Sequence, residues 1–310
     1  MANAVNEALI RDVIQDVLGR LGGETPAAPT ANDDKGSCGC SGKSGGKDFG
    51  VFQNANDACD AAAGAFLQLR EQGVEARRKI IEIVKGMCEE NADEWGRIEL
   101  EESKIGRLDH KIEKLHIIRD VPGVEWLRPD GRSGDNGITL EEYTPFGVVG
   151  AVTPSTHSIP TLAGNIVNIV AAGNAVVFNA HPAAARCAAM SVRKFNEAIH
   201  RATGIENIAC IIEQPTFDSF KEMCANENVR LLCVTGGPGV VAAAMQTGKR
   251  AICAGPGNPP VLVDTTADID RAARCVVQGA AYDNNLLCIG EKQVFVLDSV
   301  ADAFMSAMER

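Results

Sequence analysis

The alternation of short apolar runs with longer amphipathic ones restricts the fold of this sequence more than any other feature. Short runs rich in β-branched residues are the predicted strands, at residues 148–152, 175–178, 208–212 and 229–234. The stretches between them have helical spacing, at residues 159–172, 183–202 and 216–225. Nearly continuous apolar strands that alternate with helices are typical of βαβ units. The sequence therefore predicts an α/β fold with helices on both faces of a parallel sheet.

Further elements flank this pattern. Helices are predicted at residues 54–72 and 74–102, and short strands at 261–264 and 293–297. Residues 138–143 alternate apolar and polar side chains, so we expect a separate, half-exposed strand there. Parallel sheets bind ligands at the carboxyl ends of their strands, and the loops that follow the strands are therefore the candidate site.

Composition excludes several classes of function. A net charge of −11 and an aromatic content of 5% disfavour nucleic acid as a partner. The sequence contains neither an apolar run long enough to span a bilayer nor a secretory signal at its start. Its 11 cysteines are scattered without regular spacing, which indicates reduced thiols. We expect a soluble cytoplasmic protein with no membrane partner.

The first residues of the chain differ in character from the rest. Apolar side chains recur every three or four positions within residues 3–21, which predicts an amphipathic helix. Residues 22–48 are rich in Gly, Ser, Ala, Pro and Thr and predict a flexible linker. The helix either folds back on the body of the protein or docks on a partner surface. Cys38 and Cys40 lie in the linker without further ligands near them in the sequence, so no metal site is predicted.

Several loops after predicted strands carry residues suited to binding a nucleotide. Residues 235–239 (TGGPG) open a predicted helix, where bare backbone N–H groups and the helix dipole suit a phosphate. A plain tight turn is the alternative reading, because the run is not the dinucleotide fingerprint. Asn179 and His181 can hydrogen-bond an adenosine ribose. In the loop of residues 153–158, His157 is an acid–base group, an oxyanion donor or a capping side chain.

Cys288 is the strongest candidate nucleophile. It lies in a polar loop between a predicted helix that ends near residue 281 and the strand at 293–297. A thiol in such a loop can be reached by solvent and can attack a substrate, whereas a thiol inside an apolar run usually cannot.

Four motifs together resemble those of the aldehyde dehydrogenase superfamily, in their order and spacing. They are PFGVVGAVTP at residues 145–154, AAGNAVV at 171–177, VTGG at 234–237 and Cys288 in its loop. The likeness covers roughly residues 50–310. Within the superfamily, the chain looks like the CoA-acylating branch, whose members make acetyl- or propionyl-CoA in bacterial microcompartments. It implies an aldehyde-dehydrogenase-like fold with a Rossmann-type cofactor-binding domain over residues 49–253. The beginning of a second α/β catalytic domain would follow over residues 254–310.

The resemblance also implies roles for individual residues. Cys288 would be the nucleophile, and Thr156 or His157 would help to hold the oxyanion. The implied cofactor-binding residues are Thr153, Pro154, Asn179, His181, Thr235, Gly236, Gly237 and Gly239.

Departures from the family pattern refine this reading. Hydrolytic members have a glutamate where this chain has Ala254 and a ribose-binding lysine where it has Asn179. Without the carboxylate at Ala254, water lacks its general base, and a thioester on Cys288 would survive until a thiol takes the acyl group. Such enzymes also continue well past the nucleophile, so we expect the C-terminal part to be missing from this chain.

The implied activity is NAD-dependent, CoA-acylating oxidation of acetaldehyde or propionaldehyde through a cysteine thioester, with NAD and coenzyme A as cofactors. The helix of residues 3–21 looks like an encapsulation peptide, which implies a shell-protein partner and a place inside a bacterial microcompartment. The full-length protein is expected to be a homo-oligomer. The alternatives are a non-redox cysteine-dependent acyltransferase and an inactive or scaffold-type cargo fragment.

Overall fold

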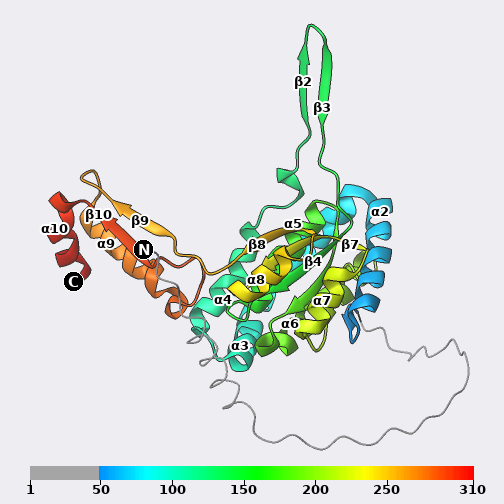
Figure 1. Ribbon diagram of the computed structural model, residues 1–310, viewed down its shortest axis with the longest axis horizontal. Coiled ribbons are helices and arrows are strands. Elements are labelled where there is room, and N and C mark those ends of the chain that lie inside the picture. Colours follow the sequence, from blue (N-terminus) through cyan, green and yellow to red (C-terminus); the bar gives the residue numbers. More distant parts are fainter. Residues whose placement is uncertain (1–48) are drawn as a thin grey trace, which may run out of the picture. The chain divides into compact units, whose positions relative to one another are not determined.

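The computed structural model describes residues 49–310, so the predicted helix of residues 3–21, the linker, Cys38 and Cys40 lie outside it. The described part contains a six-stranded parallel sheet with the order β1-β6-β5-β4-β7-β8 (Figure 1). Its strands are β1 Val51–Phe52, β4 Val148–Thr153, β5 Ala175–Ala180, β6 Ala209–Ile212, β7 Val229–Thr235 and β8 Arg250–Ala254. The predicted parallel α/β sheet is confirmed.

Helices cover both faces of this sheet (Figure 1). They are α2 Ala55–Glu90, α3 Ala92–Ser103, α4 Leu108–His116, α5 Ser158–Ala171, α6 Ala185–Thr203, α7 Phe217–Ala225 and α8 Pro238–Met245. From β4 the chain winds through α5 and α6 toward one edge of the sheet, and through α7 and α8 toward the other. Parallel crossovers are right-handed, so these two pairs of helices lie on opposite faces. β4 is therefore the strand at which the winding reverses.

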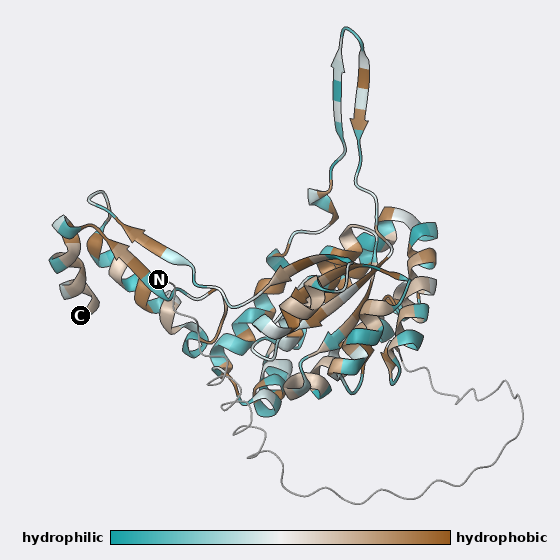
Figure 2. Cartoon of the chain, viewed as in Figure 1, coloured by the Kyte–Doolittle hydropathy of each residue, from teal (hydrophilic) through white to brown (hydrophobic). Residues whose placement is uncertain are grey.

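The core explains why the strands read as nearly continuous apolar runs. Every residue of β4, β5 and β6 is buried, because helices cover both faces. Figure 2 shows the apolar residues gathered on these strands and the hydrophilic residues on the outer faces of the helices. None of the helices between residues 49 and 310 is long and apolar enough to cross a membrane.

The last described residues form a smaller α/β element with its own core. Strands β9 Pro260–Val263 and β10 Gln293–Val296 pair in parallel, and helices α9 Ile269–Ala281 and α10 Asp298–Met308 accompany them. Their shared core consists of Val263, Ala273, Val276 and Phe304. The predicted strands at 261–264 and 293–297 are confirmed.

Some elements differ from the sequence predictions. The strand expected to be half-exposed is β3 Gly137–Glu141, which pairs with β2 Asp130–Gly134, and every residue of this hairpin is exposed. The predicted break between helices 54–72 and 74–102 is present as a kink within α2 at Gly73, whose φ is 73°. A second break, at Asn91, separates α2 from α3 and was not predicted. Helix α4 and strand β8 were not predicted.

Candidate active site

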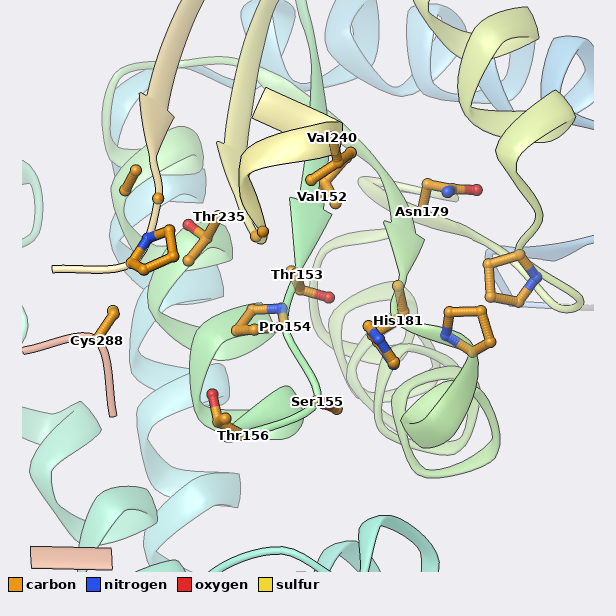
Figure 3. A pocket seen from close by; sticks show the side chains of 18 of the residues that line it. Val152, Thr153, Pro154, Ser155, Thr156, Asn179, His181, Thr235, Val240 and Cys288 are labelled. Carbon is orange, nitrogen blue, oxygen red and sulfur yellow. The ribbon is translucent and has the colours of Figure 1, made fainter. Parts of the chain in front are cut away.

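A cavity of about 560 Å³ lies at the carboxyl ends of the parallel strands (Figure 3). The loops after five strands line it, with residues 152–156, 179–182, 215–217, 235–237 and 254–257. A doubly wound sheet binds ligands where its strand order reverses, because the loops after the neighbouring strands separate there. The cavity lies at that position, next to the end of β4.

The structure brings together nearly all of the residues that the sequence singled out. The cavity is lined by Thr153, Pro154, Thr156, Asn179, His181, Thr235, Gly236, Gly237, Ala254 and Cys288. His157 instead lines a second cavity, and Gly239 lies in the first turn of α8, outside the lining of the first. Figure 3 shows Cys288 on one side of the cavity and Asn179 and His181 on the other, with Thr153 and Pro154 between them.

Cys288 differs from the buried thiols of the described part of the chain. Burial raises the pKa of Cys59 and Cys88 to about 12 and that of Cys224 to about 11. Cys288 is half-buried and is the one cysteine among residues 49–310 that lines the first cavity. It is therefore a thiol that a bound ligand can reach.

Lys292 holds the loop around Cys288 and was missed by the sequence analysis. Its Nζ donates hydrogen bonds to the carbonyl oxygens of Leu287, at 2.9 Å, and Gly290, at 3.0 Å. These two carbonyls flank Cys288, so one side chain fixes the backbone on both sides of the thiol. The available signal was its closeness to Cys288 in the sequence, but its partners are backbone atoms that the sequence does not reveal.

The end of the glycine turn after β7 can accept a phosphate at Gly237 and the start of α8, whereas the N–H of Gly236 donates to the Ala254 carbonyl at 3.1 Å. Gly237 precedes α8, which begins at Pro238 without a side-chain cap. The unpaired N–H groups of a helix N-terminus attract anions. Thr153 supports a polar ligand in the same cavity, because its Oγ1 is buried and has no hydrogen-bond partner among the described residues. A polar group of a bound ligand would satisfy that atom.

The two residues predicted to bind the ribose, Asn179 and His181, differ in whether their polar atoms are free to contact a ligand. The Oδ1 of Asn179 accepts a hydrogen bond from Ser219 Oγ at 2.7 Å, and its Nδ2 donates to the Thr216 carbonyl at 3.4 Å. His181 Nδ1 accepts from the N–H of Ala183 at 3.1 Å, so the neutral ring carries its proton on Nε2. His181 therefore offers a donor to a ligand, while Asn179 mainly ties β5 to α7.

His157 is a neutral side chain at pH 7. Burial lowers its pKa to about 4, and the positive charges of Lys114 and Lys111 act in the same direction. Its Nδ1 lies 3.0 Å from Thr156 Oγ1. The second cavity, of about 740 Å³, is lined by His157 and by Leu287, which also lines the first cavity. The residue before Cys288 therefore lies between the two cavities.

Comparisons with known proteins agree with this geometry. A sequence model described as the aldehyde dehydrogenase family matches residues 51–310. An acetaldehyde dehydrogenase (acetylating) of Bilophila wadsworthia is 38% identical over 308 residues, covering 98% of this chain and 62% of the relative. A propanal dehydrogenase (CoA-propanoylating) of Salmonella typhimurium is 35% identical over 312 residues, with the same shares of 98% and 62%.

Solved structures are also similar to this chain. A propionaldehyde dehydrogenase from the Clostridium phytofermentans fucose utilisation bacterial microcompartment is 44% identical, with a TM-score of 0.80 over 84% of this chain and 60% of that one. The propionaldehyde dehydrogenase of Rhodopseudomonas palustris, solved with bound propionyl-CoA, is 38% identical, with a TM-score of 0.79 over 84% and 58%. The chain thus spans about three fifths of the length of these relatives.

Proposed function

The chain belongs to the aldehyde dehydrogenase family, and from this premise we propose that the whole protein oxidises a short-chain aldehyde to its acyl-CoA. Acetaldehyde and propionaldehyde are the proposed substrates, because the similar enzymes are named for acetaldehyde and propanal. One observation carries the proposal: the thiol of Cys288 lines the same cavity as the glycine turn at residues 235–237. A nucleophile and a phosphate-binding turn in one cavity suit covalent chemistry beside a nucleotide.

The cavity fits a dinucleotide in its polar groups. The turn at 235–237 and the start of α8 would hold the phosphates, and His181 Nε2 and Thr153 Oγ1 would meet polar groups of the cofactor. Bound NAD would supply a hydride acceptor, and CoA a thiol that takes the acyl group. Similar structures hold propionyl-CoA and, in an engineered glycolyl-CoA reductase, NADP⁺.

Cys288 has two tasks in this proposal. Its thiol loses a proton to solvent and its sulfur attacks the aldehyde carbonyl carbon, so that a C–S bond forms, the C=O π bond opens and the carbonyl oxygen becomes an oxyanion. The N–H of Cys288 and a side chain of the 153–158 loop would donate hydrogen bonds to that oxygen. Once the C–H bond of the former aldehyde has broken with loss of hydride to the acceptor and the C=O bond has re-formed, the sulfur holds the acyl group as a thioester. The sulfur then leaves as a thiolate when the acyl group passes to CoA.

Thr156, which lines the first cavity, and His157, which lines the second, are the alternative side-chain partners proposed for the oxyanion. When the Thr156 hydroxyl donates its one proton to Nδ1 of the neutral His157, the imidazole carries its proton on Nε2 and is the donor. In the other tautomer Nδ1–H donates to Thr156, and the hydroxyl is then the group that can donate to the oxyanion. His157 would thus act as a neutral donor rather than as a charged acid at pH 7.

The surroundings of Cys288 favour transfer to a thiol over hydrolysis. Ala254 lines the first cavity, and none of the carboxylates within residues 49–310 does so. A water molecule near the thioester would therefore lack a carboxylate as its general base in this part of the protein.

The test is NADH formation from propionaldehyde by the natural full-length protein, with and without CoA. We expect turnover to require CoA and to yield propionyl-CoA. Turnover to free propionic acid without CoA would contradict the acylating assignment. Acyl exchange without a change in NADH absorbance would indicate a non-redox acyltransferase instead.

Gly257 should be sensitive to substitution because it lies against the nucleophile loop. A Cβ at Gly257 would collide with the backbone carbonyl oxygen of Cys288. We expect Gly257→Ala to lower kcat by about 10- to 100-fold, since small displacements of catalytic groups have effects of this size. Gly255→Ala is the matched comparison, because its Cβ would meet no atom within 4 Å. Equal rates for the two variants would contradict a close contact between the loops.

The proposed location is a bacterial microcompartment, because a similar enzyme comes from one. We propose that residues 3–21 bind a shell protein and that the full-length protein is a homo-oligomer. Deletion of residues 3–21 should abolish co-assembly with the shell while leaving turnover within about twofold, since none of the proposed catalytic or cofactor-binding residues belongs to that segment. Loss of turnover together with co-assembly would show that this segment is part of the folded enzyme.

A further inference from the structure

Two buried lysines on α4 meet at one carbonyl group beside the active site. Lys111 is 1% exposed and donates to Glu99 Oε1 at 2.7 Å. Lys114 is 8% exposed and donates to Asp283 Oδ2 at 2.7 Å. Both ammonium groups also donate to the backbone carbonyl of Thr156, at 2.6 Å and 3.2 Å. The proposed chemistry uses neither lysine, so their burial requires another explanation.

Asp283 holds an unusual backbone conformation in the loop that leads to Cys288. Its φ is 50°, and Asn284 and Asn285 follow with φ values of 59° and 58°. Asp and Asn adopt this left-handed region more readily than other residues with side chains, but a run of three is uncommon and indicates that surrounding contacts stabilise it. The loop before the nucleophile is therefore held by contacts outside itself.

The contacts of Asp283 come from helix α4 and from the residues that immediately precede this helix. Its N–H donates to His110 Nδ1 at 2.8 Å, and its Oδ1 accepts from the N–H of Arg107 at 2.9 Å. A Cβ at Gly106 would collide with the carboxylate, so the glycine makes room for it. The Asp283 side chain is 0% exposed, and Lys114 is the one side chain in the described part with which it forms an ion pair.

Lys114 thus connects two segments that carry the proposed catalytic groups. One of its contacts is the carbonyl of Thr156, and the other is the carboxylate of Asp283, in the loop of Cys288. Thr156 and Cys288 face the same cavity from separate segments (Figure 3). Burial lowers the pKa of Lys114, and the ion pair with Asp283 opposes that shift. Movement of the Asp283 loop away from α4 would leave a buried charge without its partner, which is strongly unfavourable, and movement of the Thr156 segment would remove a second hydrogen bond from the same ammonium group.

Lys111 provides the contrast within the same helix. It contacts the Thr156 carbonyl and Glu99, and Glu99 also accepts from the N–H groups of Ser158 and Ile159, at 3.1 Å and 2.9 Å. These contacts hold the 153–158 loop and the start of α5, and none of them reaches the loop of Cys288. Lys111 therefore anchors one segment, whereas Lys114 joins two.

We propose that Lys114 and Asp283 are positioning residues that fix the loop of Cys288 against the 153–158 loop, and so set where the nucleophile stands relative to the oxyanion donors. This role rests on the proposed function. The geometric part of it, the coupling of the two loops, can be measured without turnover.

The experiment compares Lys114→Met and Asp283→Asn in the natural full-length protein. Asparagine keeps the size of the side chain and tolerates a positive φ, but it removes the charge. Hydrogen exchange measured by mass spectrometry should become about 10-fold faster in peptides covering residues 282–290 in both variants, because local opening then costs less. At saturating substrate, kcat should fall by about 10- to 100-fold, as expected for misplaced catalytic groups. The KM for NAD⁺ should stay within about twofold, because Lys114 and Asp283 do not line the first cavity.

Tyr282→Phe is the matched control. The Tyr282 hydroxyl donates to Glu113 Oε2 at 2.9 Å, and the ring stacks on His110, so this residue also links the loop to α4. Removing the hydroxyl leaves the ion pair in place, and exchange at 282–290 and kcat should stay close to those of the parent protein.

The outcomes distinguish a positioning role of the Lys114–Asp283 pair from a purely stabilising one. Faster exchange at 282–290 with a lower kcat and an unchanged KM supports the proposal. Unchanged local exchange overturns it, even if the unfolding midpoint falls, because the ion pair then only adds global stability. If Lys114→Met does not fold, Asp283→Asn alone decides. If the parent protein shows no CoA-dependent turnover, the proposed function fails while the exchange result still reports on the coupling of the loops.

Discussion

Replacing Cys288 by serine should abolish NADH formation by the full-length protein, with a loss of at least about 10³-fold, as for other nucleophile replacements. A serine hydroxyl is not ionised at neutral pH, and none of the carboxylates of residues 49–310 lines the first cavity to accept its proton. The measurement is the initial rate of NADH formation with propionaldehyde, NAD⁺ and CoA. Binding of NADH, followed by its fluorescence, should persist, because Cys288 lies away from Asn179 and His181 in the cavity (Figure 3).

Cys88→Ser is the matched control for this prediction. Cys88 is buried in α2, and burial raises the pKa of its thiol to about 12. A serine in a helix can donate to the carbonyl one turn earlier, so the substitution is tolerated. The rate should stay within about twofold of the parent protein, since the change lies outside the cavity. A Cys288→Ser variant that retained a tenth of the parent rate would exclude this thiol as the nucleophile.

Replacing Glu99 by alanine should lower the free energy of unfolding by about 3–5 kcal/mol, the usual effect of removing one partner of a buried ion pair. Glu99 is 1% exposed, and its carboxylate pairs with Lys111, which is also 1% exposed. The same carboxylate accepts from the N–H groups of Ser158 and Ile159 in the first turn of α5. The variant would leave a buried ammonium and two backbone donors without a partner.

Urea denaturation measures this effect as a lower midpoint at an unchanged slope. Glu101→Ala is the control, because Glu101 lies on the same helix but is exposed, and it should change the free energy of unfolding by less than about 0.5 kcal/mol. A loss below about 1 kcal/mol for Glu99→Ala would mean that the Lys111 ammonium finds another partner.

Much of the fold could be predicted because its strands are buried on both faces. A strand such as β5, in which every residue is buried, must be apolar throughout, so the sequence alone indicates it. The same reasoning fails for β8, which lies at the edge of the sheet with residues that alternate between exposed and half-buried. It fails also for α4, whose buried face includes Lys111 and Lys114 and therefore reads as polar.

The first cavity was predictable because parallel strands end at one edge of the sheet. Residues as far apart in the sequence as Thr153, His181 and Thr235 therefore had to lie near one another. His157 departs from this expectation, because it follows the loop into α5 and lines the second cavity instead. The sequence could not show this difference, since the direction of a loop residue depends on the packing around it.

The sequence by itself determined the parallel α/β sheet and the family, and it led to the proposal of Cys288 as the nucleophile, because periodicity and short motifs are local properties of the chain. Only the tertiary structure revealed the pairs Glu99–Lys111 and Lys114–Asp283, the second of which joins residues 169 positions apart. A charged residue is normally assigned to the surface, and it can be buried only where folding brings an opposite charge to it. Which lysine meets which carboxylate is therefore decided by packing.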